Sequence, residues 1–259
     1  MRFEAFSLSH WAALAAAALT VAAIFAWRDR LRRPGANRTA KYGLAAVLAG
    51  SEVALQISYV IRGTWSVYSL PFELCSLTLW LSAALLLTGK RWLYEAAFFL
   101  GTLGTLQALL TPDLNDPFPS FYYFHFFIGH IAILAASVFM TAVDRFRPTF
   151  RSMLRALVWL HALAIPAAVA DIWAGTNFMF LAHKPRTASM LDLLSPWPWY
   201  LLELEAVAFV LCFALLGAVK AADRWTRRKR GRSGRSGSSG REEGEGAGDR
   251  GRMRAASAK

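Results

Sequence analysis

Long apolar blocks separated by short polar loops dominate the hydrophobic pattern of this chain. A bilayer core about 30 Å thick requires about 20 mostly apolar residues in a helix. Seven blocks are long enough, at roughly residues 8–27, 42–61, 71–88, 92–112, 121–142, 154–174 and 198–219. The pattern therefore predicts an all-α, polytopic membrane protein in which residues 1–225 form a seven-transmembrane-helix bundle.

Composition narrows the class of protein further. Apolar residues make up 56% of the 259 residues and charged residues only 18%. A soluble domain has about 45–50% apolar residues and about 25% charged residues. Because the apolar excess is concentrated in blocks, a soluble globular enzyme is excluded. The two cysteines lie far apart, which excludes a disulfide-rich scaffold, and the Trp and Phe content excludes disorder along the whole chain.

The positive charge is placed as in a membrane protein. The formal net charge is +12, and the segment from Lys220 to Lys259 supplies 13 Lys and Arg against 5 Asp and Glu. The remaining basic residues alternate, so that odd-numbered loops are rich in Lys and Arg and even-numbered loops are poor. This alternation argues against a nucleic-acid partner and predicts an N-terminus outside and a cytoplasmic C-terminus. Residues 226–259, rich in Arg, Gly, Ser and Glu, are predicted to be a disordered basic cytoplasmic tail.

Polar side chains gather in the outer half of the predicted bundle. Ionisable groups inside a span are costly and are functional candidates by default. Counting about 1.5 Å of rise per residue places the following side chains there: Glu73, Cys75, Gln107, His125, His130, Asn177, Glu203 and Glu205. We expect a polar cavity that opens to the outer side and is roofed by residues 118–127. Glu73, Gln107, His125, Asn177 and Glu203 are its expected substrate-binding residues. The alternative is that neighbouring helices satisfy each polar group separately.

Cys75 is the candidate nucleophile. A thiol needs a base to become a thiolate, because its ordinary pKa is near 8.5. His130 is the best-placed base and His125 the second choice, while Glu203 or Glu205 is a candidate to orient the imidazole on grounds of depth alone. A cysteine in a membrane span also serves as a small apolar filler, and Cys212, among apolar neighbours, illustrates that role.

Metal and cofactor sites are poorly supported by the histidine spacing. His125 and His130 are five residues apart and point about 140° away from each other on a helix, so the i, i+4 pair of a helical zinc site is missing. A haem held between His130 and His161 is a remaining alternative. The inner half of the bundle otherwise offers Glu52 and Gln56, which share one helix face.

Several segments together resemble a known family. They are Leu70-Pro71-Phe72-Glu73-Leu74-Cys75, Gly104 to Leu114, Phe126-Phe127-Ile128-Gly129-His130, Asn177 to Leu181 and Pro196 to Tyr200. Over about residues 40–220 the chain resembles the YwaF-type bacterial integral membrane proteins, which are similar to the transmembrane protein 164 acyltransferases. The family pattern has His or Gln in place of Glu73 and Gly in place of Ser195.

The resemblance implies a seven-helix phospholipid acyltransferase of the cell membrane. It implies that Cys75 carries the acyl group as a thioester, that His130 is the base, and that the acceptor is a lysophospholipid. Membrane phospholipids are then the partners, and no metal or organic cofactor is needed. If water accepts the acyl group, the protein is a lipase. A transporter or channel using the same cavity, and a lipid-binding protein without turnover, remain as alternatives.

Overall fold

The computed structural model describes residues 3–185 and 190–226, and the described part of the chain is helical without β-strands. The chain falls into two compact units, Met1–Phe213 and Ala214–Lys259. The boundary lies inside the last long helix, and only the end of that helix is described in the second unit. The tail predicted over 226–259 lies outside the described residues, apart from Thr226.

Six described helices are long and apolar enough to cross a membrane. They are α1 (Leu8–Ala26), α3 (Pro34–Ile61), the composite helix Arg91–Leu110, α7 (Phe121–Ala142), α8 (Phe150–Ala174) and the last helix, Trp199–Thr226. The composite helix consists of α5 (Arg91–Ala96), a π-helical turn η2 (Ala97–Gly101) and α6 (Thr102–Leu110). Short turns complete the path: α2 (Arg28–Leu31), η1 (Val67–Ser69), η3 (Phe178–Phe180) and η4 (Met190–Leu193).

The third predicted span is shorter than its apolar block. Helix α4 covers Leu74–Thr88, 15 residues, which corresponds to about 22 Å at the usual rise. The extended backbone of Glu73 (φ −64°, ψ 144°) delays the start of the helix to Leu74, and Gly89, with a positive φ of 63°, ends it. Pro71 restricts only the residue before it, Leu70, to an extended backbone. The all-helical prediction is confirmed, whereas by length only six of the seven blocks are full spans.

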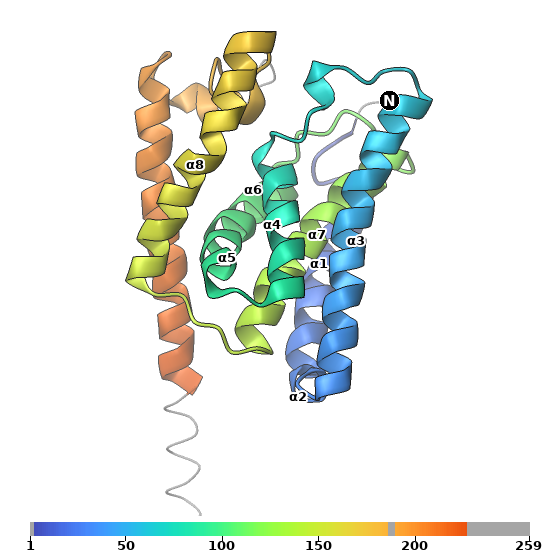
Figure 1. The fold of residues 1–259 in the computed structure, drawn as a ribbon, viewed down its shortest axis with the longest axis vertical. Helices are drawn as coiled ribbons and strands as arrows, with labels where there is room; N and C mark the ends of the chain where they lie inside the picture. The colour runs from blue at the N-terminus through green and yellow to red at the C-terminus, as the bar shows by residue number, and fades with distance from the viewer. Residues whose placement is uncertain (1–2, 186–189, 227–259) are drawn as a thin grey trace, which may run out of the picture. The chain divides into compact units, whose positions relative to one another are not determined.

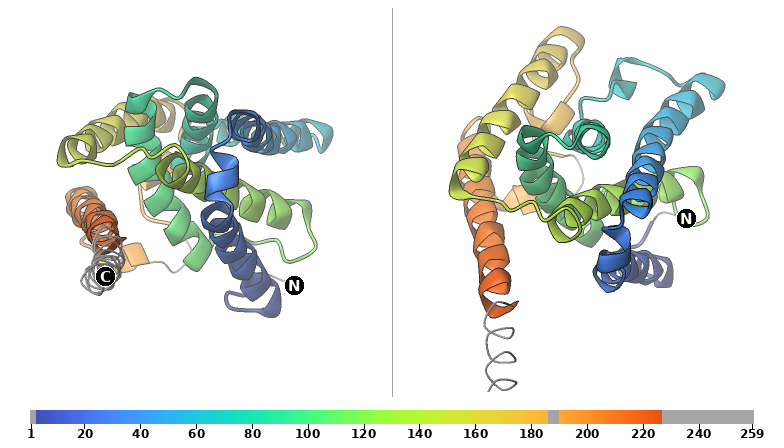
Figure 2. Two further views of the ribbon diagram at one scale, coloured as in Figure 1. Left: turned by 90° about the horizontal axis from the view of Figure 1, so that it is seen from below. Right: turned by 60° about the horizontal axis from the view of Figure 1, so that its bottom comes forward.

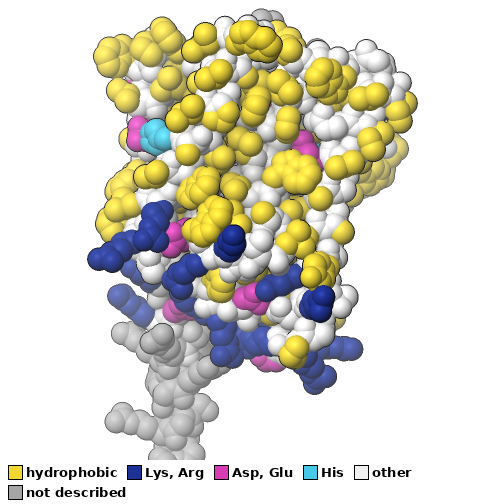
Figure 3. All heavy atoms as spheres, in the orientation of Figure 1, with side chains coloured by type: hydrophobic (Ala, Val, Ile, Leu, Met, Phe, Trp, Pro, Cys, Tyr) yellow, Lys and Arg dark blue, Asp and Glu magenta, His cyan; other side chains and the backbone are white. Residues whose placement is uncertain are grey.

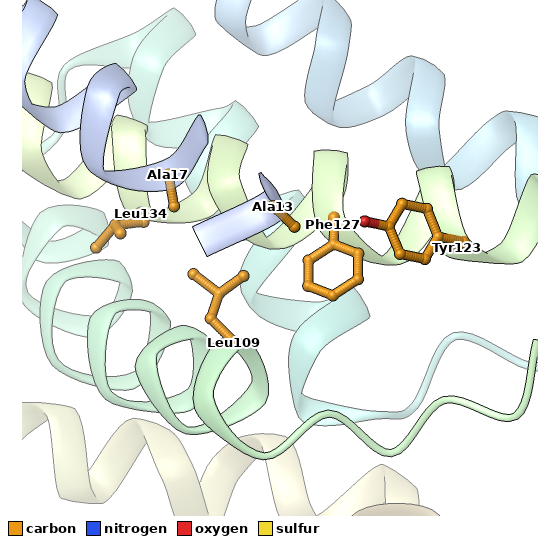
Figure 4. Close-up of a cluster of buried hydrophobic side chains, with 6 residues drawn as sticks. All are labelled: Ala13, Ala17, Leu109, Tyr123, Phe127 and Leu134. Carbon is orange, nitrogen blue, oxygen red and sulfur yellow. The ribbon is translucent and has the colours of Figure 1, made fainter. Parts of the chain in front are cut away.

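Helix α7 is central to the packing of the first unit. It contacts α1, α3, α4 and α6, while α3 also packs along α4 (Figures 1 and 2). A cluster of buried side chains joins three of these helices, and Figure 4 shows its members: Ala13, Ala17, Leu109, Tyr123, Phe127 and Leu134. The two alanines let the backbone of α1 come close to α7, as small residues do in membrane helices. Because α4 packs against α7, the third and fifth predicted blocks adjoin.

Three basic loops meet at one end of the first unit. Arg32, after α2, donates to the carbonyl oxygens of Ala142 and Val143 at the end of α7. Lys41 of α3 forms an ion pair with Asp144. Arg91, at the start of α5, donates to the carbonyl oxygen of Arg147 at 3.3 Å. Figure 3 shows Lys and Arg gathered toward the lower part of the face in view, with hydrophobic side chains above them.

Candidate active site

Cys75 and His130 lie in direct contact. Cys75 is in the first turn of α4 and partly exposed, and His130 is buried in α7. The Cys75 Sγ to His130 Nε2 distance is 3.2 Å, the separation that a nucleophile and its base require. Two residues 55 positions apart in the sequence are thus brought to hydrogen-bond distance by the packing of α4 on α7.

The second ring nitrogen fixes the tautomer of His130. Its Nδ1 lies 2.7 Å from the carbonyl oxygen of Phe126, one turn earlier in α7. A carbonyl oxygen only accepts, so Nδ1 carries the hydrogen and Nε2 has a free lone pair directed at the Cys75 thiol. The ring of Phe126 packs against the imidazole at a centroid distance of 4.3 Å. His130 is therefore arranged to take a proton from Cys75.

Two features of the backbone support this pair. An added Cβ at Gly129 would lie 3.5 Å from Ser51 Oγ of α3 and 3.8 Å from Leu79 Cδ1 of α4, so the three helices pack closely beside the imidazole. Cys75 lies in the first turn of α4, where the positive end of the helix dipole stabilises negative charge. Because the Glu73 carboxyl group two residues earlier opposes this effect, ionisation of the thiol depends on His130.

A separate polar network joins α4 to α3 beside Cys75. Ser76, the residue after Cys75, donates to Glu52 Oε2 at 3.3 Å. Gln56 Nε2 lies 3.5 Å from Glu52 Oε1 and 2.9 Å from the carbonyl oxygen of Ser69. Glu52 is 2% exposed. The shared face expected for Glu52 and Gln56 is present, and Ser76, which the sequence did not single out, joins it to α4.

The expectation of one cavity holding all the outer polar residues is wrong. A cavity of about 520 Å³ is present, but of the predicted substrate-binding residues it brings together only Glu73 and Asn177. Its walls come from Tyr68, Glu73, the loop after α6 and residues 175–185, so residues 118–127 do not roof it. Side chains at one depth on different helices point in different directions, and depth alone does not reveal this.

The other predicted residues lie elsewhere. Gln107 is exposed on α6. His125 stacks on Phe121 at a centroid distance of 6.2 Å, and its Nε2 is buried without a hydrogen-bond partner. Glu203 accepts from the backbone N–H of Ser195 at 2.7 Å and from its hydroxyl. Among the described residues, none of these three forms a hydrogen bond, ion pair or ring contact with Cys75 or His130.

The hypothesis that Glu203 or Glu205 orients the His130 imidazole is wrong. Glu203 holds Ser195, and Glu205 Oε1 lies 3.4 Å from Nε2 of a different histidine, His161. The orienting group of His130 is instead a carbonyl of its own helix. His161 Nδ1 contacts the carbonyl oxygen of Leu157 at 2.8 Å. The ring nitrogens of His130 and His161 thus all contact protein atoms, which argues against a haem held between them.

Comparison with known proteins shows the family of the chain. A model of the TMEM164 family matches residues 5–216. The chain belongs to the TMEM164 family. The match includes α1 and therefore begins earlier than the resemblance over about residues 40–220 indicated. Membership in the TMEM164 family and the apolar helices together establish a multi-pass membrane protein. No curated protein and no solved structure matches the chain.

Proposed function

We propose that this chain is a phospholipid acyltransferase of the cell membrane in which Cys75 is the nucleophile and His130 the general base. The observation that carries the proposal is the 3.2 Å contact between Cys75 Sγ and a His130 Nε2 whose lone pair is free. The resemblance to the transmembrane protein 164 acyltransferases supports the reaction type, and membership in the TMEM164 family supports the membrane setting.

The proposed reaction proceeds through a thioester. His130 Nε2 takes the thiol proton while Cys75 Sγ attacks an ester carbonyl of a phospholipid. The ester C–O bond then breaks, and the departing lysophospholipid oxygen takes the proton from Nε2. In the second half, Nε2 takes the hydroxyl proton of an acceptor lysophospholipid, whose oxygen attacks the thioester carbonyl. The C–S bond breaks, and the sulfur recovers the proton. Water in place of the acceptor would give hydrolysis.

We infer seven spans with the N-terminus outside and the C-terminus in the cytoplasm. The short helix α4, third in chain order, is the span added to the six long ones. Contacts among the basic loops at 28–41, 89–91 and 143–155 support one common cytoplasmic end. Alkaline-phosphatase and fluorescent-protein reporters fused after residue 90 and after residue 184 test this inference. Fluorescence at 90 and phosphatase activity at 184 are expected, and the reverse pattern would contradict it.

The nucleophile is tested with a matched pair of cysteine variants. Cys75→Ala should fold and insert but lose covalent labelling by a phospholipid analogue carrying an activated ester. Cys212→Ala is the control, because Cys212 lies buried on the last helix and is the other cysteine of the chain. Undiminished labelling of Cys75→Ala would rule out Cys75 as nucleophile. Solute flux into vesicles that survives loss of Cys75 would instead favour a carrier.

A further inference from the structure

A second hollow of the molecule lies between α3 and α4. It has a volume of about 410 Å³, and neither Cys75 nor His130 lines it. The two helices pack side by side (Figure 1), and small side chains leave the space between them open. These side chains are five alanines: Ala45, Ala46 and Ala49 of α3, and Ala83 and Ala84 of α4. The hollow is therefore an apolar groove along two neighbouring membrane helices.

The groove ends before the level of the candidate active site. Trp80 and Leu87 line it on α4, and the helix rises about 10 Å between them. One turn beyond Trp80, toward the start of α4, Ser76 donates to Glu52 Oε2 of α3 at 3.3 Å. This hydrogen bond joins the two helices at the level of Cys75. The groove is thus a site separate from the thiol, on the opposite side of this polar bridge.

The other end of the groove reaches the basic end of the bundle. Tyr42 lines it there, and the exposed Arg38, one turn earlier on α3, places its guanidinium carbon 5.4 Å from the centre of the Tyr42 ring. The exposed Lys90 follows Leu87 by three residues, just after α4 ends. Among the described residues neither cation forms an ion pair. Two positive charges without an acidic partner therefore flank this end of the groove.

The combination matches the two parts of an anionic phospholipid. An apolar groove between helices accommodates an acyl chain, and a guanidinium group binds phosphate oxygens through parallel hydrogen bonds. Basic pockets between membrane helices on the cytoplasmic side bind anionic headgroups. A zwitterionic lipid would bring its own ammonium group toward Arg38 and Lys90, so a lipid with net negative charge should be preferred. The C-terminal segment of the chain is an unsuitable occupant, because 13 Lys and Arg outnumber 5 Asp and Glu from Lys220 to Lys259.

We propose that the groove between α3 and α4 binds one anionic phospholipid of the cytoplasmic leaflet, with an acyl chain along the alanines and the phosphate at Arg38. The bound lipid has no part in the chemistry at Cys75, so the proposal goes beyond the proposed function. Because the lipid contacts both helices, it favours the packing of α3 on α4. A ligand that binds only the folded state raises stability by mass action.

The proposal is tested by lipid retention, in a Cys75→Ala background so that no lipid is consumed. The full chain is purified in detergent and offered phosphatidylglycerol and phosphatidylcholine with identical acyl chains, and retained lipid is measured by native mass spectrometry. Retention of phosphatidylglycerol several-fold above phosphatidylcholine is expected, together with a higher unfolding temperature in phosphatidylglycerol. Equal retention of the two lipids would overturn the proposal.

Two substitutions locate the site. Arg38→Gln removes the proposed phosphate ligand, and Ala46→Phe fills the groove; each should reduce the preference for phosphatidylglycerol several-fold. Arg30→Gln and Val47→Phe are the matched controls and should leave the preference unchanged, because both residues are exposed and neither lies at the groove.

Two outcomes of these variants would contradict the site. A preference that survives Arg38→Gln would remove the phosphate ligand, and this exposed position keeps the test decisive even if Ala46→Phe does not fold. A preference that is lost in Arg38→Gln but kept in a folded Ala46→Phe would show attraction of the headgroup to the surface alone, without an acyl chain in the groove. Because Cys75 is absent throughout, a failed nucleophile does not affect either result.

Discussion

Replacement of His130 by Gln tests the base directly. In the structure the Nε2 atom of the imidazole makes the 3.2 Å contact with Cys75 Sγ. The hydrogen bond from Nδ1 to the carbonyl oxygen of Phe126 fixes the tautomer. Gln keeps polar atoms near that position but is not basic at neutral pH. General-base catalysis contributes about 10²–10⁴-fold. At 1.36 kcal/mol per factor of ten, the variant should lose about 3–5 kcal/mol of transition-state stabilisation.

The assay is the single-turnover rate of thioester formation between pH 6 and 9. Without the base, only spontaneously ionised thiol reacts, so the rate of His130→Gln should rise about tenfold per pH unit below the titration of the thiol. The unmodified protein should depend much less on pH once its imidazole is neutral. His161→Gln is the control, because His161 pairs with Glu205. A loss of less than about threefold in His130→Gln, with an unchanged pH profile, would refute the reasoning.

Two further predictions concern the stability of the scaffold. Gly101→Ala should destabilise the protein by about 1–3 kcal/mol, because the added Cβ would lie 3.0 Å from Ile133 Cγ2. An added Cβ at Gly104 meets nothing within 4 Å, so Gly104→Ala should be neutral or slightly stabilising. Thermal unfolding in detergent compares the two variants, and equal unfolding temperatures would contradict the packing argument. Arg155→Ala should lower the free energy of unfolding by about 1–3 kcal/mol, since it leaves the buried Glu95 carboxyl group without its partner at 3.1 Å. Substitution of the exposed Arg151 by Ala should change that free energy by less than about 0.5 kcal/mol. An equal effect of both substitutions would show that the ion pair contributes nothing.

Much of the helical framework could be predicted from hydrophobicity, because a membrane-spanning helix must be apolar over most of its length. The block at 71–88 shows where that reasoning fails. Hydrophobicity does not register that Glu73 has an extended backbone, so the apolar block begins three residues before α4. That difference matters, because it puts Cys75 in the first turn of the helix.

Depth along a helix predicted the meeting of Cys75 and His130 but failed for the wider cavity. Depth gives one coordinate, and the direction in which a side chain points depends on how each helix is rotated. The cavity is also built largely from irregular loops, whose paths the apolar pattern does not encode. The position of Asp113 beside Glu73 in the cavity lining therefore does not follow from the sequence pattern. The segment Thr111-Pro112-Asp113, part of the resemblance to the family, was the available signal for Asp113.

The most direct test of the account is the mass of Cys75 during turnover. The protein is mixed with a phospholipid, quenched in acid within one turnover, digested, and the peptide containing Cys75 is weighed. The account predicts an added acyl mass on Cys75 that neutral hydroxylamine removes and that disappears when a lysophospholipid acceptor is added. Formation of the transferred product without any acyl mass on Cys75, or at an undiminished rate in Cys75→Ala, would contradict it.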